Sequence, residues 1–185
     1  MKPALRKPAV IAAFTVAFGV AAVTFRAMAG PERVEFPVGY QQKFVVFGAT
    51  DRPDRKPAQV RVFYANPEAA AAARADQPVP DGAVLIMEDR KAKLGAAGNP
   101  EKDATGRFIA SDDVLAVFVQ EKRRGWGEAY PANVRNGDWD YAVFQPGGAR
   151  RDVSTAGCFS CHLKRAPTDY TFIFQRWAID GKPTN

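Results

Sequence analysis

The stretch "DVLAVFVQEKR", Asp113 to Arg123, decides the fold. It is rich in β-branched and aromatic residues, and its side chains follow the two-residue period of a β-strand. Four further stretches share this character and are bounded by Pro, Gly, Asn or Asp, which favour turns. They are "YQQKFVVF" (40–47), "AQVRVFYA" (58–65), "AVLIME" (83–88) and "DYAVFQ" (140–145). A mainly antiparallel sheet is therefore predicted.

Two short helices are predicted beside this sheet. "PEAAAAARA", Pro67 to Ala75, combines Asn66 as a candidate N-cap with a proline in the first turn and a run of alanines. Near the end of the chain, Asp152 and Ser154 can cap a helix that runs to about Lys164. The predicted fold class is α+β, mainly β, with an antiparallel sheet and a few short helices. One helix carries a cysteine motif near the C-terminus.

Residues 1–29 have the composition of a secretory signal peptide. Three Lys and Arg residues precede an uncharged apolar run from 9 to 25, and residues 27–29, Ala-Met-Ala, form a small-x-small cleavage pattern. Because Arg26 lies close to that site and the apolar run is long for a signal peptide, an uncleaved membrane anchor is the alternative. Either way we expect a periplasmic or otherwise exported protein, with residues 30–185 forming a single domain.

The net charge does not indicate a nucleic-acid partner. The formal charge of the whole chain is +6, from 26 basic and 20 acidic residues. Four of the basic residues lie in the first 29 residues, which contain no acid, so the remainder carries only +2. No nucleic-acid binding is therefore predicted.

The stretch "CFSCH", Cys158 to His162, contains both cysteines of the chain and its single histidine. Cys-x-x-Cys-His is the attachment signature of c-type haem, in which two thiols bind the porphyrin and the histidine binds iron. On a helix, residues three and four apart share a face, so all three side chains can meet one porphyrin. We expect one covalently bound haem c per chain, with Cys158 and Cys161 as the thioethers and His162 as the proximal iron ligand.

Three other uses of the motif are less consistent with the chain. A thioredoxin-like dithiol usually opens a helix early in a βαβ domain, whereas this motif lies near the end of a sheet protein. A zinc site would lack its fourth ligand, because no further Cys or His exists. A plain disulfide gives no reason for the histidine.

The other side of the iron has one candidate ligand. Once the first 29 residues are removed, Met87 is the only methionine, and therefore the only thioether for a His/Met electron-transfer centre. Its setting in "AVLIMED" favours a core residue of a strand. Without Met87, the sixth position is open or held by water or lysine, and an open apolar site favours gases such as NO or CO. Predicted strand phenylalanines that could form the core or wall a pocket are Phe44, Phe47, Phe63, Phe118 and Phe144.

Several segments, taken in order, resemble the cytochrome P-460 family, which includes cytochrome c′-beta. They are "FPVGY" (36–40), "RVFYANPEA" (61–69), "PDGAVLIMED" (80–89), "CFSCH" (158–162) and "DYTFIFQRW" (169–177). The resemblance implies a mainly antiparallel β fold, a homodimer and one covalent haem with a proximal histidine. It also implies one of two activities. The P-460 enzymes oxidise hydroxylamine with a haem cross-linked to lysine, whereas c′-beta members lack the cross-link and bind NO or CO.

Three positions depart from the enzymes of that family. Met87 matches their cross-linking lysine, while Ala116 and Val153 match two carboxylates of their haem pocket. Lys91 and Lys93 lie on the same side of the predicted strand as Met87. At ~3.3 Å per residue they are ~13 and ~20 Å from it, which is beyond the reach of a lysine side chain, so neither is expected to replace the cross-linking lysine. The remaining acids with a possible route to a pocket are expected at the surface; they are Glu88, Asp89, Glu121 and Glu128.

These observations predict an exported mono-haem c cytochrome that binds NO or CO at pentacoordinate iron, with Met87 and Val153 as possible pocket residues beside His162. Two alternatives stay open. One is an oxidoreductase acting on hydroxylamine or peroxide, for which no catalytic residue is assigned, and the other is an electron carrier with His162 and Met87 as axial ligands. Expected partners are the small ligand or hydroxylamine, a redox protein and a second copy of the chain.

Overall fold

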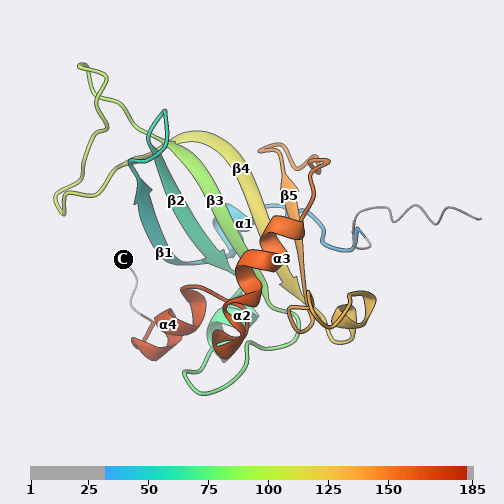
Figure 1. The fold of residues 1–185 in the computed structure, drawn as a ribbon. Coiled ribbons are helices and arrows are strands. Elements are labelled where there is room, and N and C mark those ends of the chain that lie inside the picture. The colour runs from blue at the N-terminus through green and yellow to red at the C-terminus, as the bar shows by residue number, and fades with distance from the viewer. Residues whose placement is uncertain (1–31, 183–185) are drawn as a thin grey trace, which may run out of the picture.

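A single antiparallel sheet of five strands forms the centre of the molecule (Figure 1). The computed structural model describes residues 32–182. The strands are paired in chain order, each with the next, and are β1 (Val45–Arg52), β2 (Gln59–Ala65), β3 (Val84–Ala92), β4 (Ala110–Lys122) and β5 (Trp139–Phe144). The predicted fold class, α+β and mainly β, is confirmed. The proposed signal segment, 1–29, lies outside the described residues.

Short helices cover the two faces of this sheet unequally. Helix α3 crosses in front of the sheet with α4 and α2 below it, while α1 and the N-terminal segment lie behind (Figure 1). The α-helices are α1 (Tyr40–Lys43), α2 (Pro67–Ala72), α3 (Ala156–Leu163) and α4 (Phe174–Ile179); the 3₁₀ helices are η1 (Trp126–Ala129) and η2 (Ala166–Thr168). Both cysteines lie in α3, as predicted. Within the described residues, no helix is long and apolar enough to span a membrane.

The prediction of a strand over residues 40–47 is wrong in its first half. Gly39 has a left-handed backbone, with φ 74°, and turns the chain into the single helical turn of α1. The amide of Phe44 closes that turn by donating to the carbonyl of Tyr40 at 2.8 Å. β1 therefore begins only at Val45. The alternation of apolar residues could not reveal this turn, because it depends on the backbone of the glycine before it.

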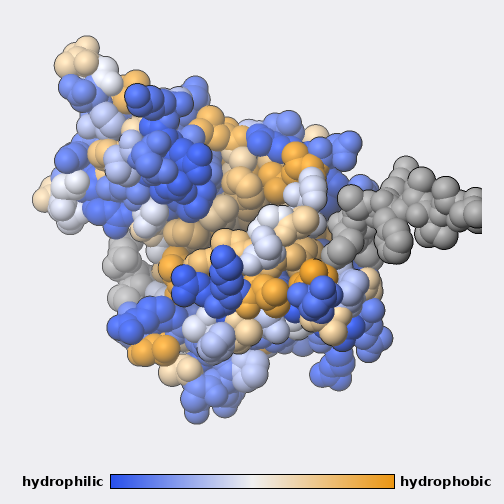
Figure 2. All heavy atoms as spheres, viewed as in Figure 1, coloured by the Kyte–Doolittle hydropathy of each residue, from blue (hydrophilic) through white to orange (hydrophobic). Residues whose placement is uncertain are grey.

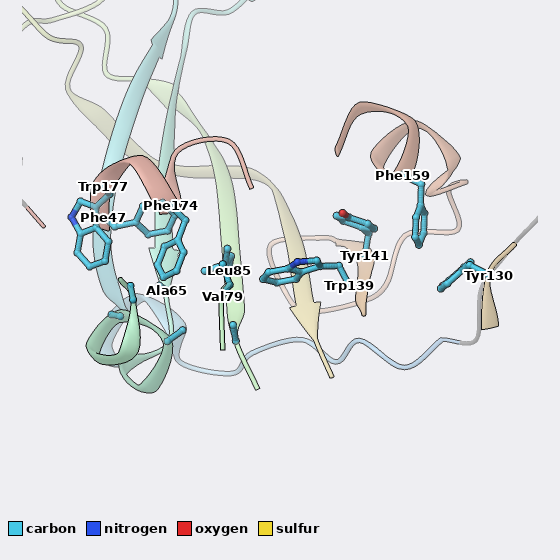
Figure 3. Packing of buried hydrophobic residues seen from close by; sticks show 14 residues of the cluster. Phe47, Ala65, Val79, Leu85, Tyr130, Trp139, Tyr141, Phe159, Phe174 and Trp177 are labelled. Carbon is cyan, nitrogen blue, oxygen red and sulfur yellow. The ribbon is translucent and has the colours of Figure 1, made fainter. Parts of the chain in front are cut away.

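Two cores pack on opposite faces of the sheet. The helix-face core joins the strands to α2, α3 and α4, and its buried aromatic residues are Phe47, Tyr130, Trp139, Tyr141, Phe159, Phe174 and Trp177 (Figure 3). The back-face core lies under the N-terminal segment and includes Val34, Tyr40, Tyr64, Ile86, Val117, Val119, Ala142 and Phe144. Because side chains alternate between faces along each strand, neighbouring residues of one strand enter different cores.

A buried carboxylate fastens the N-terminal segment to the back face. Glu88, in β3, is 0% exposed and accepts hydrogen bonds from the Tyr40 hydroxyl, from Gln41 Nε2 at 2.7 Å and from the Tyr64 hydroxyl at 3.0 Å. It also forms an ion pair with Arg90. Burial alone would raise the pKa of Glu88, but the hydrogen bonds from Arg90, Tyr40 and Gln41 outweigh it and lower the pKa.

Three of the four acids expected at the surface are buried instead. Glu88, Asp89 and Glu121 are buried, and only Glu128 is exposed. Each buried acid has an arginine partner, which offsets the cost of removing its charge from water. These partners are Arg90 for Glu88, Arg61 for Asp89 and Arg123 for Glu121.

We expect Glu88→Leu to lower the free energy of unfolding at pH 7 by about 3 kcal/mol, because it leaves Arg90 and two tyrosine hydroxyls without their acceptor. Chemical denaturation measures this loss, and the exposed Glu128→Leu control should change stability by less than about 0.5 kcal/mol.

The same comparison tests the pH dependence. Since folding lowers the pKa of Glu88, its contribution is complete above the ordinary value of 4.5 and is lost as pH falls through the folded-state pKa. The wild type should therefore lose more stability on acidification than Glu88→Leu does. Parallel curves for the two proteins would contradict the assignment.

Candidate functional site

Helix α3 is anchored to the sheet by one buried aromatic side chain. Phe159 is 3% exposed, and its ring lies 4.5 Å from the ring of Tyr130 and 4.8 Å from that of Tyr141 (Figure 3). With Phe159 buried, the flanking Cys158 is half-buried and Cys161 is exposed. The helix thus presents its two thiols at the boundary between the core and the surface.

His162 is held in one orientation by a backbone carbonyl. Its Nδ1 lies 2.7 Å from the carbonyl oxygen of Tyr170, and a carbonyl can only accept, so Nδ1 carries the hydrogen. Nε2 is then the nitrogen with a free lone pair, which is the arrangement usual for a metal-bound histidine. Burial lowers the pKa of His162, although the bond to Tyr170 opposes this, and the imidazole is neutral at neutral pH.

The loop that supplies this carbonyl has an unusual backbone. Asp169 and Tyr170 both adopt left-handed conformations, with φ 47° and 58°, which cost energy for residues other than glycine. Side chains of the sheet hold the loop in place. Trp139 Nε1 donates to the Asp169 carbonyl at 2.9 Å, and Lys122 Nζ lies 2.7 Å from the Asp169 carboxylate. The sequence motif gave no sign of this loop, since it lies eight residues beyond the histidine.

An apolar row crosses the sheet beside α3. Residues directly opposite one another in antiparallel strands point to the same face. The pairings Phe63 with Met87, Met87 with Phe118 and Phe118 with Val143 therefore put four apolar side chains in one row. Leu85, two residues before Met87, belongs to the helix-face core, so this row faces the helices.

Met87 lies in β3 as predicted, but it is half-buried and belongs to neither core. Phe118 beside it is likewise half-buried and outside both cores. In Figure 2, hydrophobic residues gather over the middle of the sheet, between the hydrophilic connection after β3 and the helices. The row next to α3 thus leaves apolar surface in reach of a flat apolar ligand.

An ion pair lies next to this row on the same face, two residues farther along the strands. Arg61, Asp89 and Ala116 lie opposite one another on β2, β3 and β4. The guanidinium of Arg61 binds both carboxylate oxygens of Asp89, at 2.7 and 2.9 Å. Ala116 itself is buried. The departure at Ala116 removes one acid from this face, but the neighbouring strand places Asp89 there, buried and not at the surface as predicted.

The possible pocket residue Val153 is exposed, and the two lysines predicted to be out of reach form ion pairs elsewhere. Val153 is 51% exposed in the segment before α3. Lys91 and Lys93 are bound to acids of the adjoining segments, with Nζ 3.0 Å from Asp113 and 2.7 Å from Glu101. Neither lysine lies in the row of Met87, as the distances along the strand predict.

The residues around α3 fit a c-type haem better than the other uses of the motif. Burial raises the pKa of the Cys158 thiol, the opposite of what activates a catalytic dithiol. Among residues 32–182, no group of three or more His, Cys, Asp and Glu side chains is placed to hold a metal ion, as a zinc site requires. An oriented histidine, two thiols on one helix and an adjoining apolar row are instead what haem c requires.

Arg61→Met should lower the free energy of unfolding by about 3 kcal/mol, because the largely buried carboxylate of Asp89 would lose its counter-ion. Lys91→Met is a matched control: its pair with Asp113 is exposed, so a loss below about 1 kcal/mol is expected. Thermal and urea unfolding of both variants measure the difference. Equal losses would show that the Arg61 pair is no more than a surface contact.

Comparison with known proteins identifies the family. No curated protein matches the chain significantly. The family model described as Cytochrome P-460 matches residues 37–173, which is most of the chain and includes the five strands, α3 and the loop of Tyr170. The chain therefore belongs to the cytochrome P-460 family, a family of haem c cytochromes.

Proposed function

We propose that the chain is an exported mono-haem c cytochrome that binds NO or CO at the iron. In this proposal Cys158 and Cys161 form the thioethers and His162 is the proximal ligand. Haem iron held by one histidine supplies an open coordination position for a diatomic ligand. The observation that carries the proposal is the apolar row of Phe63, Met87, Phe118 and Val143, which contains no lysine where the hydroxylamine-oxidising relatives have their cross-link.

The surroundings of Met87 argue against its use as an axial ligand. Met87 lies in β3, between two strands, and has Phe63 and Phe118 directly opposite it. Thioether sulfur makes favourable contacts with aromatic rings, so these neighbours offer the side chain an apolar setting of its own. An electron carrier with His162 and Met87 as ligands is therefore the less favoured function.

A second candidate, hydroxylamine oxidation, is favoured by one observation. Removing protons from a bound substrate needs a base within reach. Asp89 provides a carboxylate on the site face, across from Ala116, and Arg61 fixes its orientation. The missing lysine at position 87 opposes this candidate.

The proposal also includes a periplasmic location, a homodimer and a redox protein as partner. The signal-like composition of residues 1–29 supports export, and the family supports the dimer and the single haem. Fractionation of cells and the mass of the purified protein in solution test the location and the dimer.

Visible spectroscopy of the purified protein tests the main proposal. The ferrous protein should be high-spin and should bind CO and NO at once. Its haem should remain with the protein after acid-acetone extraction, because the thioethers are covalent. A ferrous protein that stays low-spin and ignores both gases would overturn the function, and extractable haem would overturn the attachment.

Met87→Leu distinguishes gas binding from electron transfer. The substitution conserves volume, so the ligand-binding protein should keep its ferric and ferrous spectra and its affinity for CO. A His/Met centre would instead show a weak near-infrared sulfur band in the wild type and lose it in the variant. Observation of that loss would favour the electron carrier.

Asp89→Asn tests the second candidate. If the protein oxidises hydroxylamine with Asp89 as the base, the variant should lose about 10²-fold or more in kcat. The matched substitution Asp113→Asn, at an exposed acid, should leave the rate unchanged. No hydroxylamine oxidation by the wild type would dismiss the candidate.

A further inference from the structure

The carbonyl of Tyr170 accepts two hydrogen bonds, of which the one from His162 is only the first. Gln120 Nε2 donates to the same oxygen at 3.0 Å. A carbonyl oxygen has two lone pairs, so these two donors occupy its full capacity. The bond that orients the iron ligand therefore shares its acceptor with a side chain that is remote in sequence.

Gln120 reaches the carbonyl from the face of the sheet that the helices cover. It lies in β4 opposite Leu85 and Tyr141 and is 8% exposed. The same Nε2 lies 3.4 Å from the Tyr141 hydroxyl, and the ring of Tyr141 lies 4.9 Å from the imidazole of His162. Gln120 thus touches both the hydrogen-bond acceptor and the aromatic neighbour of the histidine.

The loop itself does not need Gln120 to stay in place. The amide of Tyr170 donates to the Arg165 carbonyl at 2.8 Å, and the amide of Thr171 donates to the Thr168 carbonyl at 3.0 Å. Because these bonds fix the peptides on both sides, the Tyr170 carbonyl should keep its direction when Gln120 is replaced. What changes is the electron density that the oxygen offers to the Nδ1 hydrogen of His162.

We propose that Gln120 is a positioning residue that limits the hydrogen bond from His162 to Tyr170 and thereby tunes the iron ligand. A donor on one lone pair withdraws electron density from the oxygen, which makes it a weaker acceptor for the second donor. A weaker bond at Nδ1 leaves the imidazole less anionic and less electron-donating at Nε2. The inference rests on the proposed ligation of iron by His162.

Gln120→Leu removes the N–H donor and tests the proposal in the haem-loaded protein. The frequency of the iron–histidine stretch, measured by resonance Raman spectroscopy of the ferrous form, should rise. The midpoint potential should fall because the more basic imidazole stabilises ferric iron. Mutation of an outer-shell partner commonly changes metal affinity or activity by tenfold or more. A tenfold change in the one-electron equilibrium corresponds to about 59 mV.

Two variants separate this effect from a structural one. Asn136→Leu is the matched control, because Asn136 Nδ2 also donates to the Tyr141 hydroxyl, at 2.9 Å, and to the Phe159 carbonyl of α3, at 3.1 Å, but has no bond to the Tyr170 carbonyl. It should leave the stretch and the potential unchanged. If Gln120→Leu does not fold, Gln120→Met has nearly the same length without a donor and should give the same shifts.

The outcomes distinguish this inference from the proposed function. An unchanged stretch and potential in a folded Gln120 variant would overturn the role of Gln120 alone, as would equal shifts in Asn136→Leu. A wild-type protein without an iron–histidine stretch, or without covalent haem, would overturn the ligation by His162 on which the inference rests.

Discussion

The hydrogen bond from His162 Nδ1 to the Tyr170 carbonyl is the constraint on which the arrangement of the site depends. It selects the tautomer that leaves Nε2 free, and it requires a carbonyl that points back at α3. The chain achieves this by placing Asp169 and Tyr170 in left-handed conformations. Such conformations persist only when their surroundings hold them. The side chains of Trp139 and Lys122, on β5 and β4, provide that support.

The register of the sheet explains why the support and the pocket lie side by side. Cross-strand neighbours of Leu85 lie under α3 and include Gln120 and, beyond it, Tyr141. Two residues along each strand, the row of Met87 and Phe118 is half-buried and apolar. A shift of one residue in any pairing would turn these side chains to the other face. The packing of the back-face core and the hydrogen bonds of Glu88 therefore also stabilise the strand register that places the site residues.

Local sequence patterns were sufficient to predict the main features of the fold and the helix that carries the Cys-x-x-Cys-His motif. The alternation in Asp113–Arg123 predicted β4, and helical spacing placed Cys158, Cys161 and His162 together on what is now α3. The burial of Asp89 could not be predicted locally, because its partner Arg61 lies on another strand. The same holds for Gln120, whose acceptor is 50 residues away. Met87 is only half-buried, although its setting in a strand predicts a core residue, because composition does not show where the helices stop covering a strand.

X-ray absorption spectroscopy at the iron edge of the reduced, haem-loaded protein tests the central claim most directly. The claim is that His162 is the one axial ligand and that Met87 leaves the other position open. The spectrum should fit a five-coordinate iron with porphyrin and histidine nitrogens only. A sulfur ligand, or a six-coordinate iron in the absence of added gas, would contradict it.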